Sequence, residues 1–189
     1  MRLEVAEFIK KYQDDLFGDW VYAVTKDNKY RYILGHFFNN RYQNLLVCFG
    51  INPSTATPAK LDNTVSRVAD TALRNGYDGW LMFSIYPERA TNPDAMHQEM
   101  APEALYNLEV IKETILCFKI TEVWFAYGNL LEKRNYLPDL LLKIKKILRD
   151  TNCKSFTFCP LSKAGHPRHP LYLSKEVLSL HNKKYLDDC

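Results

Sequence analysis

The stretch Leu45-Leu46-Val47-Cys48-Phe49-Gly50-Ile51-Asn52-Pro53-Ser54 decides the fold of this chain. Its first five residues are continuously apolar, which is typical of a strand buried on both faces in the centre of a parallel sheet. Gly50 lets the backbone turn sharply after the strand, and Pro53 stiffens the turn. We therefore expect Asn52 and Ser54 to be held at the mouth of a central strand. An ordinary strand-to-loop turn with a capping Asn would show the same pattern.

Strand-like and helix-like segments alternate through the rest of the chain. The N-terminal part predicts an amphipathic helix over 3–17 and an antiparallel hairpin formed by 20–25 and 30–38. Strands separated by helices predict βαβ units, and hence a three-layer α/β/α fold with a central, mostly parallel four-stranded sheet. The further expected strands cover 80–85, 122–127 and 155–159, and the expected helices cover 62–74, 102–118, 137–149 and a last one capped by Ser174.

Length and composition favour one globular domain over residues 1–189. Hydrophobic residues make up 47% of the 189 residues, which is enough for a packed core. No apolar run approaches the roughly 18 residues that a membrane span needs, and the charged segment 1–7 lacks the apolar region of a secretory signal. We expect a cytoplasmic monomer without membrane contact. The net charge of +3 permits a nucleic-acid partner but does not argue for one.

The five cysteines do not form a metal or disulfide pattern. Their number is odd and none lies in a CxxC pair, so neither a disulfide framework nor a cysteine-based zinc or iron–sulfur site is expected. His166 and His169 could ligate a metal, but no carboxylate or cysteine lies at ligand spacing from them. We therefore expect no metal and no cofactor.

The segment 160–172 is a second candidate loop. It contains two histidines, an arginine, a lysine and three prolines after the last expected strand. A stiff, cationic loop suits an anion such as phosphate, and His169 can donate a hydrogen bond to a developing negative charge. A purely structural loop is the alternative.

Two further segments carry charged side chains near strand or helix ends. Arg89, in the segment 86–93, could clamp a phosphate or pair with an acid in an ordinary salt bridge. Asp62, Thr64 and Arg67 cluster at a helix N-terminus, where capping explains Asp62 equally well. Arg67 lies one turn into that helix and could reach an anion.

These segments lie far apart in the sequence, but one rule brings them together. Ligands of open α/β sheets bind at the carboxyl ends of the strands. The loops that carry Asn52, Arg89, Gly128 and His169 all follow expected strands. We therefore expect them to meet at one edge of the molecule.

The order of these loops along the chain resembles the order of the motifs in the uracil-DNA glycosylase superfamily. Residues 50–54 resemble its first, water-activating motif, and His169-Pro170-Leu171 resembles its second, HPS-type motif. Between them, 81–93 and 105–128 look like its strand with an Arg-containing loop and its next helix–strand unit. The chain also resembles a family of small bacterial and phage proteins catalogued as a domain of unknown function, which carries an NPS and G-x-P-x-HPLY signature.

The glycosylase resemblance implies a uracil-DNA glycosylase-like fold and a role for each motif. Asn52 would orient the water that attacks C1′ of a flipped nucleotide, and His169 would stabilise the departing anionic base. Leu171 and Tyr172 would wedge into the duplex. Phe49 would stack on the base, and Ser54, Lys163 and Arg168 would hold phosphates. The implied substrate-contacting set is Phe49, Gly50, Ile51, Pro53, Ser54, Arg67, Ser84, Arg89, Lys163, His166, Arg168, Leu171 and Tyr172.

Two departures from the superfamily pattern bear on the substrate. Ser84 stands where an Asn often reads the pyrimidine edge, and the second motif reads HPLY. We therefore expect a glycosylase-like hydrolase of a damaged or modified base in DNA rather than of plain uracil. An enzyme acting on free nucleotides or nucleosides, and a non-catalytic nucleic-acid-binding module of the same fold, are the alternatives.

Overall fold

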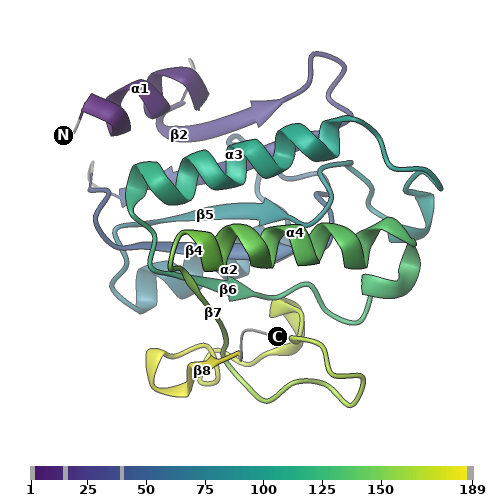
Figure 1. Cartoon of the computed structure of the whole chain (residues 1–189). Helices are drawn as coiled ribbons and strands as arrows, with labels where there is room; N and C mark the ends of the chain where they lie inside the picture. Colours follow the sequence, from purple (N-terminus) through teal and green to yellow (C-terminus); the bar gives the residue numbers. More distant parts are fainter. Residues whose placement is uncertain (1–2, 15–16, 39–40, 187–189) are drawn as a thin grey trace.

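The computed structural model describes residues 3–14, 17–38 and 41–186, which form one mixed sheet with helices on both faces (Figure 1). Within these ranges the strand order is β1-β2-β3-β5-β4-β6-β7-β8. The strands are β1 Gln13–Asp14, β2 Phe17–Val24, β3 Arg31–Phe37, β4 Leu45–Gly50, β5 Gly79–Ser84, β6 Glu122–Phe125, β7 Lys154–Thr157 and β8 Lys184–Tyr185.

The centre of the sheet is parallel and its two sides are antiparallel. The strands β5, β4, β6 and β7 pair in parallel, whereas four of the seven pairings in the described sheet are antiparallel. The prediction of a mostly parallel sheet is therefore wrong for the sheet as a whole. The reason is that the expected β2–β3 hairpin is not a separate appendage: β3 pairs with β5 and extends the sheet.

The helices cover both faces of the sheet, as expected for an α/β fold. In Figure 1, α3 (Glu103–Phe118) and α4 (Tyr136–Asp150) lie on one face, and α2 (Asn63–Arg74) lies on the other. Alternate side chains of β4 feed the two hydrophobic clusters: Val47 and Phe49 belong to one, and Leu46 and Cys48 to the other. This alternation follows from the two-residue period of a strand.

The N-terminal and C-terminal segments differ from expectation. The helix α1 covers Leu3–Tyr12 and ends earlier than predicted. The helix expected after Ser174 is absent from the described residues: Ser174 caps only a turn. Burial of Leu178 and a hydrogen bond from the Leu180 amide to Asn75 Oδ1 then draw the chain against the end of α2 and onward to β8.

The other helix boundaries follow the sequence signals. The Asp62 side chain accepts a hydrogen bond from the Val65 amide and caps α2. Gly76, at φ +72°, lies just beyond the end of α2.

Cys48 and Cys153 are buried, whereas Cys189 lies outside the described residues. Among the helices described, none has the length and apolarity to cross a bilayer.

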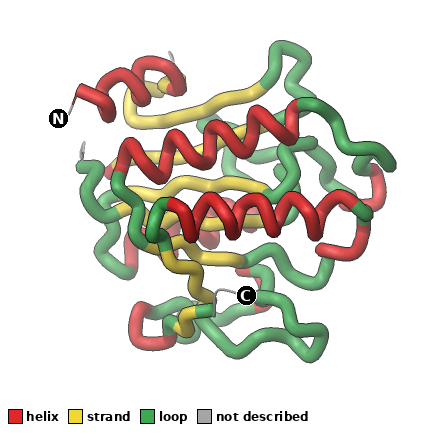
Figure 2. Tube along the Cα trace, in the orientation of Figure 1, coloured by secondary structure: helices red, strands yellow, loops and turns green. Residues whose placement is uncertain are grey.

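The strand ends gather the loops that matter for function. Figure 2 shows loop segments collected at the end of the sheet toward which β4 and β5 run. Backbone hydrogen bonds continue past these two strands, from Ile85 to the Gly50 carbonyl and from Tyr86 to the Ile51 carbonyl. The loop that carries Asn52 is therefore tied directly to the loop that follows β5.

Candidate functional site

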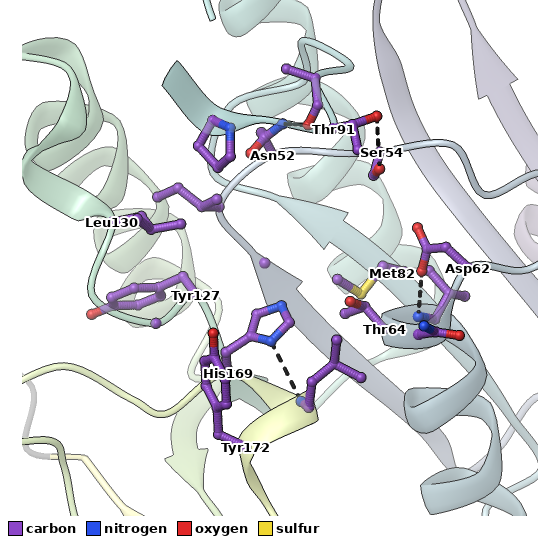
Figure 3. A pocket seen from close by; sticks show the side chains of 18 of the residues that line it. Asn52, Ser54, Asp62, Thr64, Met82, Thr91, Tyr127, Leu130, His169 and Tyr172 are labelled. Carbon is purple, nitrogen blue, oxygen red and sulfur yellow. Dashed lines mark hydrogen bonds between the residues drawn. The ribbon is translucent and has the colours of Figure 1, made fainter. Parts of the chain in front are cut away.

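A cavity of about 760 Å³ opens at the carboxyl ends of the parallel strands (Figure 3). Its walls come from the loops after β4, β5, β6 and β7, from the N-terminus of α2 and from the start of β3. The volume lies within the range of roughly 300–1,000 Å³ that is usual for small-molecule sites. The expected meeting of the Asn52, Gly128 and His169 loops at one edge is confirmed, since all three residues line this cavity.

Asn52 forms one wall of the cavity, and the main chain fixes its orientation. Its Nδ2 donates to three backbone carbonyls, those of Pro53 (2.9 Å), Glu88 (3.4 Å) and Ala90 (2.8 Å). Carbonyl oxygens only accept, so the amide nitrogen must face them. The Oδ1 atom takes part in none of these bonds and is left to accept a hydrogen bond from a molecule in the cavity.

His169 forms another wall, and its hydrogen bonds fix its tautomer. Its Nδ1 accepts a hydrogen bond from the Leu171 amide at 3.4 Å, at the start of the short 3₁₀ turn Pro170–Tyr172. Burial lowers the pKa of His169, and the Asp62 carboxylate partly opposes this shift. The ring is therefore neutral at pH 7, with its proton on Nε2, and in Figure 3 this edge faces the cavity.

Gly128 supports the His169 loop from behind. Its amide donates to the Pro167 carbonyl at 3.0 Å, which joins the loop after β6 to the loop after β7. Gly128 adopts φ +70°, and a Cβ atom there would lie 3.4 Å from the Cβ of His169. The positive φ favours glycine at this position, and the added Cβ would make an ordinary contact with His169.

Apolar side chains line much of the space between the two walls. Met82, Tyr127 and Leu130 line the cavity together with Leu171, and Figure 3 shows Tyr127 beside His169 and Leu130 between Tyr127 and the Asn52 loop. Burial raises the pKa of Tyr127 to about 12, so its hydroxyl stays protonated at pH 7. A Cβ at Gly50 would approach the Met82 Cε to 2.9 Å, so the end of the Met82 side chain would have to move.

The end of the cavity near α2 carries two charges, on Arg31 and Asp62. Arg31 was missed as a site residue by sequence reasoning. It is only 3% exposed, and its hydrogen bond to a described residue runs from Nη1 to the Ala56 carbonyl at 3.0 Å. Burial and the nearby Arg89 lower the pKa of Arg31 to about 10, while Asp62 opposes the shift, so the guanidinium remains charged at pH 7.

A register shift in β3 explains why Arg31 reaches the cavity. Ala23 pairs with Ile33, but the next residue, Val24, pairs with Arg31, so Tyr32 is an extra residue in the ladder. Such bulges re-aim side chains. Strict alternation would have placed Arg31 on the same face as Ile33, which belongs to the hydrophobic cluster of Val47 and Phe49.

About half of the residues predicted from sequence line the cavity. Those that do are Gly50, Ile51, Asn52, Ser54, Arg168, His169, Leu171 and Tyr172. Those that do not are Phe49, Pro53, Arg67, Ser84, Arg89, Lys163 and His166.

Two of these misplaced residues belong to the core. Phe49 is fully buried and packs between Phe83 and Phe125, with centroids 5.5 Å from each, so its ring has no face free for a base. Ser84 is 2% exposed and lies at the end of β5, where its carbonyl accepts from Asn107. The stacking role predicted for Phe49 is wrong, and the aromatic side chains that line the cavity near His169 are Tyr127 and Tyr172.

Arg89 and Pro53 support the Asn52 loop from outside the cavity. Arg89 Nε donates to the Ser54 carbonyl at 3.0 Å, and its Nη1 donates to the Tyr22 hydroxyl and Asn28 Oδ1 at 2.9 and 2.5 Å. The Pro53 carbonyl accepts from Ala90 as well as from Asn52. Arg89 therefore neither clamps a cavity ligand nor pairs with an acid in the described part of the chain.

The remaining three predicted residues that do not line the cavity, Arg67, Lys163 and His166, lie beside it. His166 Nε2 is 2.8 Å from the exposed Glu132 carboxylate and points to that side chain. Lys163 is exposed, and Arg67 is half-buried on α2, one turn away from the residues that line the cavity. Over residues 3–14, 17–38 and 41–186, no group of three His, Cys, Asp or Glu residues could hold a metal ion.

The fold and the cavity define an α/β protein with a ligand-sized site at the carboxyl ends of its parallel strands. The chain belongs to the family described as "Protein of unknown function (DUF1643)", whose model matches residues 31–171. The matched segment begins at Arg31 and ends at Leu171, and so contains every residue of the cavity walls discussed above except Tyr172. No curated protein and no solved structure matches the chain significantly.

Proposed function

We propose that this protein is a DNA-glycosylase-like hydrolase that accepts a flipped, damaged or modified base in the cavity and cleaves its N-glycosidic bond. The observation that carries the proposal is the pairing of two side chains on one cavity. Asn52 offers a fixed acceptor, and the neutral His169 offers a fixed donor. Hydrolysis of a glycosidic bond needs both a positioned water and a group that stabilises the leaving base.

In the proposed reaction, Asn52 Oδ1 accepts a hydrogen bond from the attacking water and directs its oxygen toward C1′. The bond between C1′ and the base nitrogen breaks, and its electron pair leaves with the base. His169 donates from Nε2 to the developing anion. The water oxygen bonds to C1′ and loses a proton to solvent, and the released base takes up a proton. An amide cannot act as a strong base. Asn52 therefore suits a transition state in which the glycosidic bond is largely broken before the water attacks C1′.

The mouth of the cavity supports a polymeric substrate. Tyr172 is 82% exposed and Leu171 is 42% exposed, and both follow His169 closely in the chain. An exposed apolar pair at the rim can occupy the space that a flipped nucleotide leaves in a duplex. Arg168, exposed at the same rim, can contact a phosphate.

The centre of the sheet is compatible with a uracil-DNA glycosylase-like fold. The four parallel strands β5, β4, β6 and β7 carry the loops of the site at their carboxyl ends. We infer this finer fold class from the order of the motifs along these strands, and the antiparallel strands on either side are additions to it.

Incubation with DNA followed by alkali tests the proposed function, because abasic sites break in alkali. The panel contains duplex and single-stranded DNAs with uracil, deaminated, oxidised and hypermodified bases. We expect strand breaks at one class of base, with wild type but not with Asn52→Ala. No break on any DNA, together with binding of free nucleotides and no affinity for DNA, would exclude a glycosylase.

A further inference from the structure

The charged end of the cavity holds an unusual cation. Arg31 is buried, yet among the described residues one carbonyl, that of Ala56, accepts a hydrogen bond from its five N–H donors. Arg31 forms no ion pair within 4.0 Å with any described acidic side chain. A buried charge that lacks partners is costly, so the remaining donors need acceptors from the cavity.

Asp62 supplies the opposite charge on the same cavity but is not bonded to Arg31. One of its oxygens, Oδ1, accepts from the Val65 amide at 2.9 Å and caps α2. In Figure 3, the Asp62 carboxylate lies on the α2 side of the cavity, across from Asn52 and His169. The two charges face one space, separated by more than a contact distance.

This arrangement favours a ligand group that offers both acceptors and donors over a purely anionic group at the charged end. The positive charge of Arg31 attracts a phosphate, but the carboxylate of Asp62 repels it. His169 is neutral, and the nearby Arg89 does not line the cavity, because its guanidinium donates to Ser54, Tyr22 and Asn28. A neutral group that offers acceptors to Arg31 and donors to Asp62 satisfies both side chains at once.

We propose that Arg31 and Asp62 read the polar edges of the base, and that the base they select is guanine or a guanine derivative. Guanine offers two adjacent acceptors, O6 and N7, to an arginine fork. It also offers two adjacent N–H donors, at N1 and the 2-amino group, to a carboxylate. Uracil and thymine have one N–H donor, at N3, between two carbonyl acceptors, so they offer neither two adjacent acceptors nor two adjacent donors. Adenine presents its 6-amino group to the arginine and N1 to the carboxylate, which is a mismatch at both.

This inference rests on the proposed function in one respect: the cavity ligand is taken to be a nucleobase. Binding experiments can therefore test the inference without measuring catalysis. Isothermal titration calorimetry with the four free deoxynucleosides measures the preference of the wild-type protein. We expect deoxyguanosine to bind at least about tenfold more tightly than deoxyadenosine or deoxycytidine. Equal affinities, no binding of any nucleoside, or competition by inorganic phosphate at the same site would overturn the proposal.

Asp62→Asn sharpens the test because asparagine caps a helix as well as aspartate does. With Oδ1 still bonded to the Val65 amide, the new NH₂ group replaces the free carboxylate oxygen and faces the donors of guanine. We expect deoxyguanosine affinity to fall about tenfold or more, while deoxycytidine, which offers acceptors, binds more tightly than before. An equal loss for all four nucleosides would contradict base reading by Asp62.

Asp70→Asn is the matched control. Asp70 lies on the same helix, but it pairs with Arg74 and Lys175 outside the cavity, at 3.0 and 3.6 Å. We expect this variant to keep the wild-type order of nucleoside affinities.

Failure of this inference and failure of the proposed function are distinguishable. A guanine preference that changes in Asp62→Asn, without abasic sites on any DNA, retains the inference and rejects the glycosylase. Abasic sites at a pyrimidine, without a guanine preference in binding, would retain the glycosylase and reject the guanine inference.

Discussion

The two walls of the cavity that carry Asn52 and His169 are built in different ways. Asn52 is held by three main-chain carbonyls from its own loop and the loop after β5. His169 is held by one local amide, its loop is joined to Gly128 through the Pro167 carbonyl, and the residues that follow it at the rim are exposed. A wall fixed by the main chain suits the placement of a water, whereas an exposed wall suits contact with a large substrate. The comparison predicts that changes on the Asn52 wall affect folding more than changes on the His169 wall.

The largest stability effect is expected for Asn52→Asp. The new carboxylate would face three carbonyl oxygens and could donate to none of them, which costs about 3 kcal/mol of unfolding free energy at neutral pH. These surroundings raise the pKa of the new carboxyl in the folded state. The folded protein then binds the proton more tightly than the unfolded chain, so the loss shrinks as the pH falls.

Urea unfolding at neutral and at mildly acidic pH measures this effect. Asn52→Ala is the control, since it removes the same donor without adding a titratable group. If the unfolding free energies of the two variants showed the same dependence on pH, the three backbone carbonyls around Asn52 would not be what fixes its orientation.

A smaller effect is expected for Gly128→Ala, because alanine is strained at positive φ. The expected cost is about 1–2 kcal/mol. Gly76→Ala is a matched control, since Gly76 has nearly the same φ, +72°, and a methyl group there would meet no described atom within 4 Å. Both variants should lose similar stability in thermal unfolding.

The two glycine variants should differ in activity. The Gly128 amide joins its loop to the His169 loop through the Pro167 carbonyl, so strain at this position should displace His169 and base release should fall in Gly128→Ala and not in Gly76→Ala. Equal activity in both would show that Gly128 does not position His169.

The smallest effect is the pH dependence that His169 confers on stability. Its folded pKa lies below the ordinary value of 6.5 because the ring is buried. As the pH falls below 6.5, the unfolded chain binds a proton more readily than the folded protein, so stability decreases. His169→Asn should remove this part of the acid destabilisation while still capping the turn.

Unfolding free energies at a series of pH values, compared between wild type and His169→Asn, measure this difference. Burial also lowers the pKa of His36, but that contribution is common to both proteins. A wild type that gains stability relative to the variant as the pH falls would mean that His169 is protonated in the fold.

Two arginines illustrate what the sequence can predict about this site. Arg89 lies in a loop after a strand, and the rule that places ligands at strand ends made it a candidate, but its donors bond to Ser54, Tyr22 and Asn28. Arg31 lies in a strand among aromatic residues, and nothing in the neighbouring sequence indicates that it belongs to a site. Its position in the cavity depends on the bulge at Tyr32, which arises from the pairing of two strands and is not visible in a single segment.

The central parallel strands and the loops that follow them were predictable for a physical reason. Continuous apolar runs such as 45–49 predict buried strands, and parallel strands place their carboxyl ends at one edge. This logic identified Asn52, Gly128 and His169 correctly as neighbours. It could not show that Phe49 packs inward, because a residue next to a motif can face either side of the sheet.

We propose that Asn52 and His169 act together in releasing a base from DNA. The most direct test measures the single-turnover rate of free-base release by mass spectrometry for wild type, Asn52→Ala and His169→Ala. Asn44→Ala, an exposed residue at the other end of β4, is the control. We predict that each site variant releases the base about 100-fold more slowly than wild type and that the control does not. Release at the wild-type rate by Asn52→Ala would contradict the account.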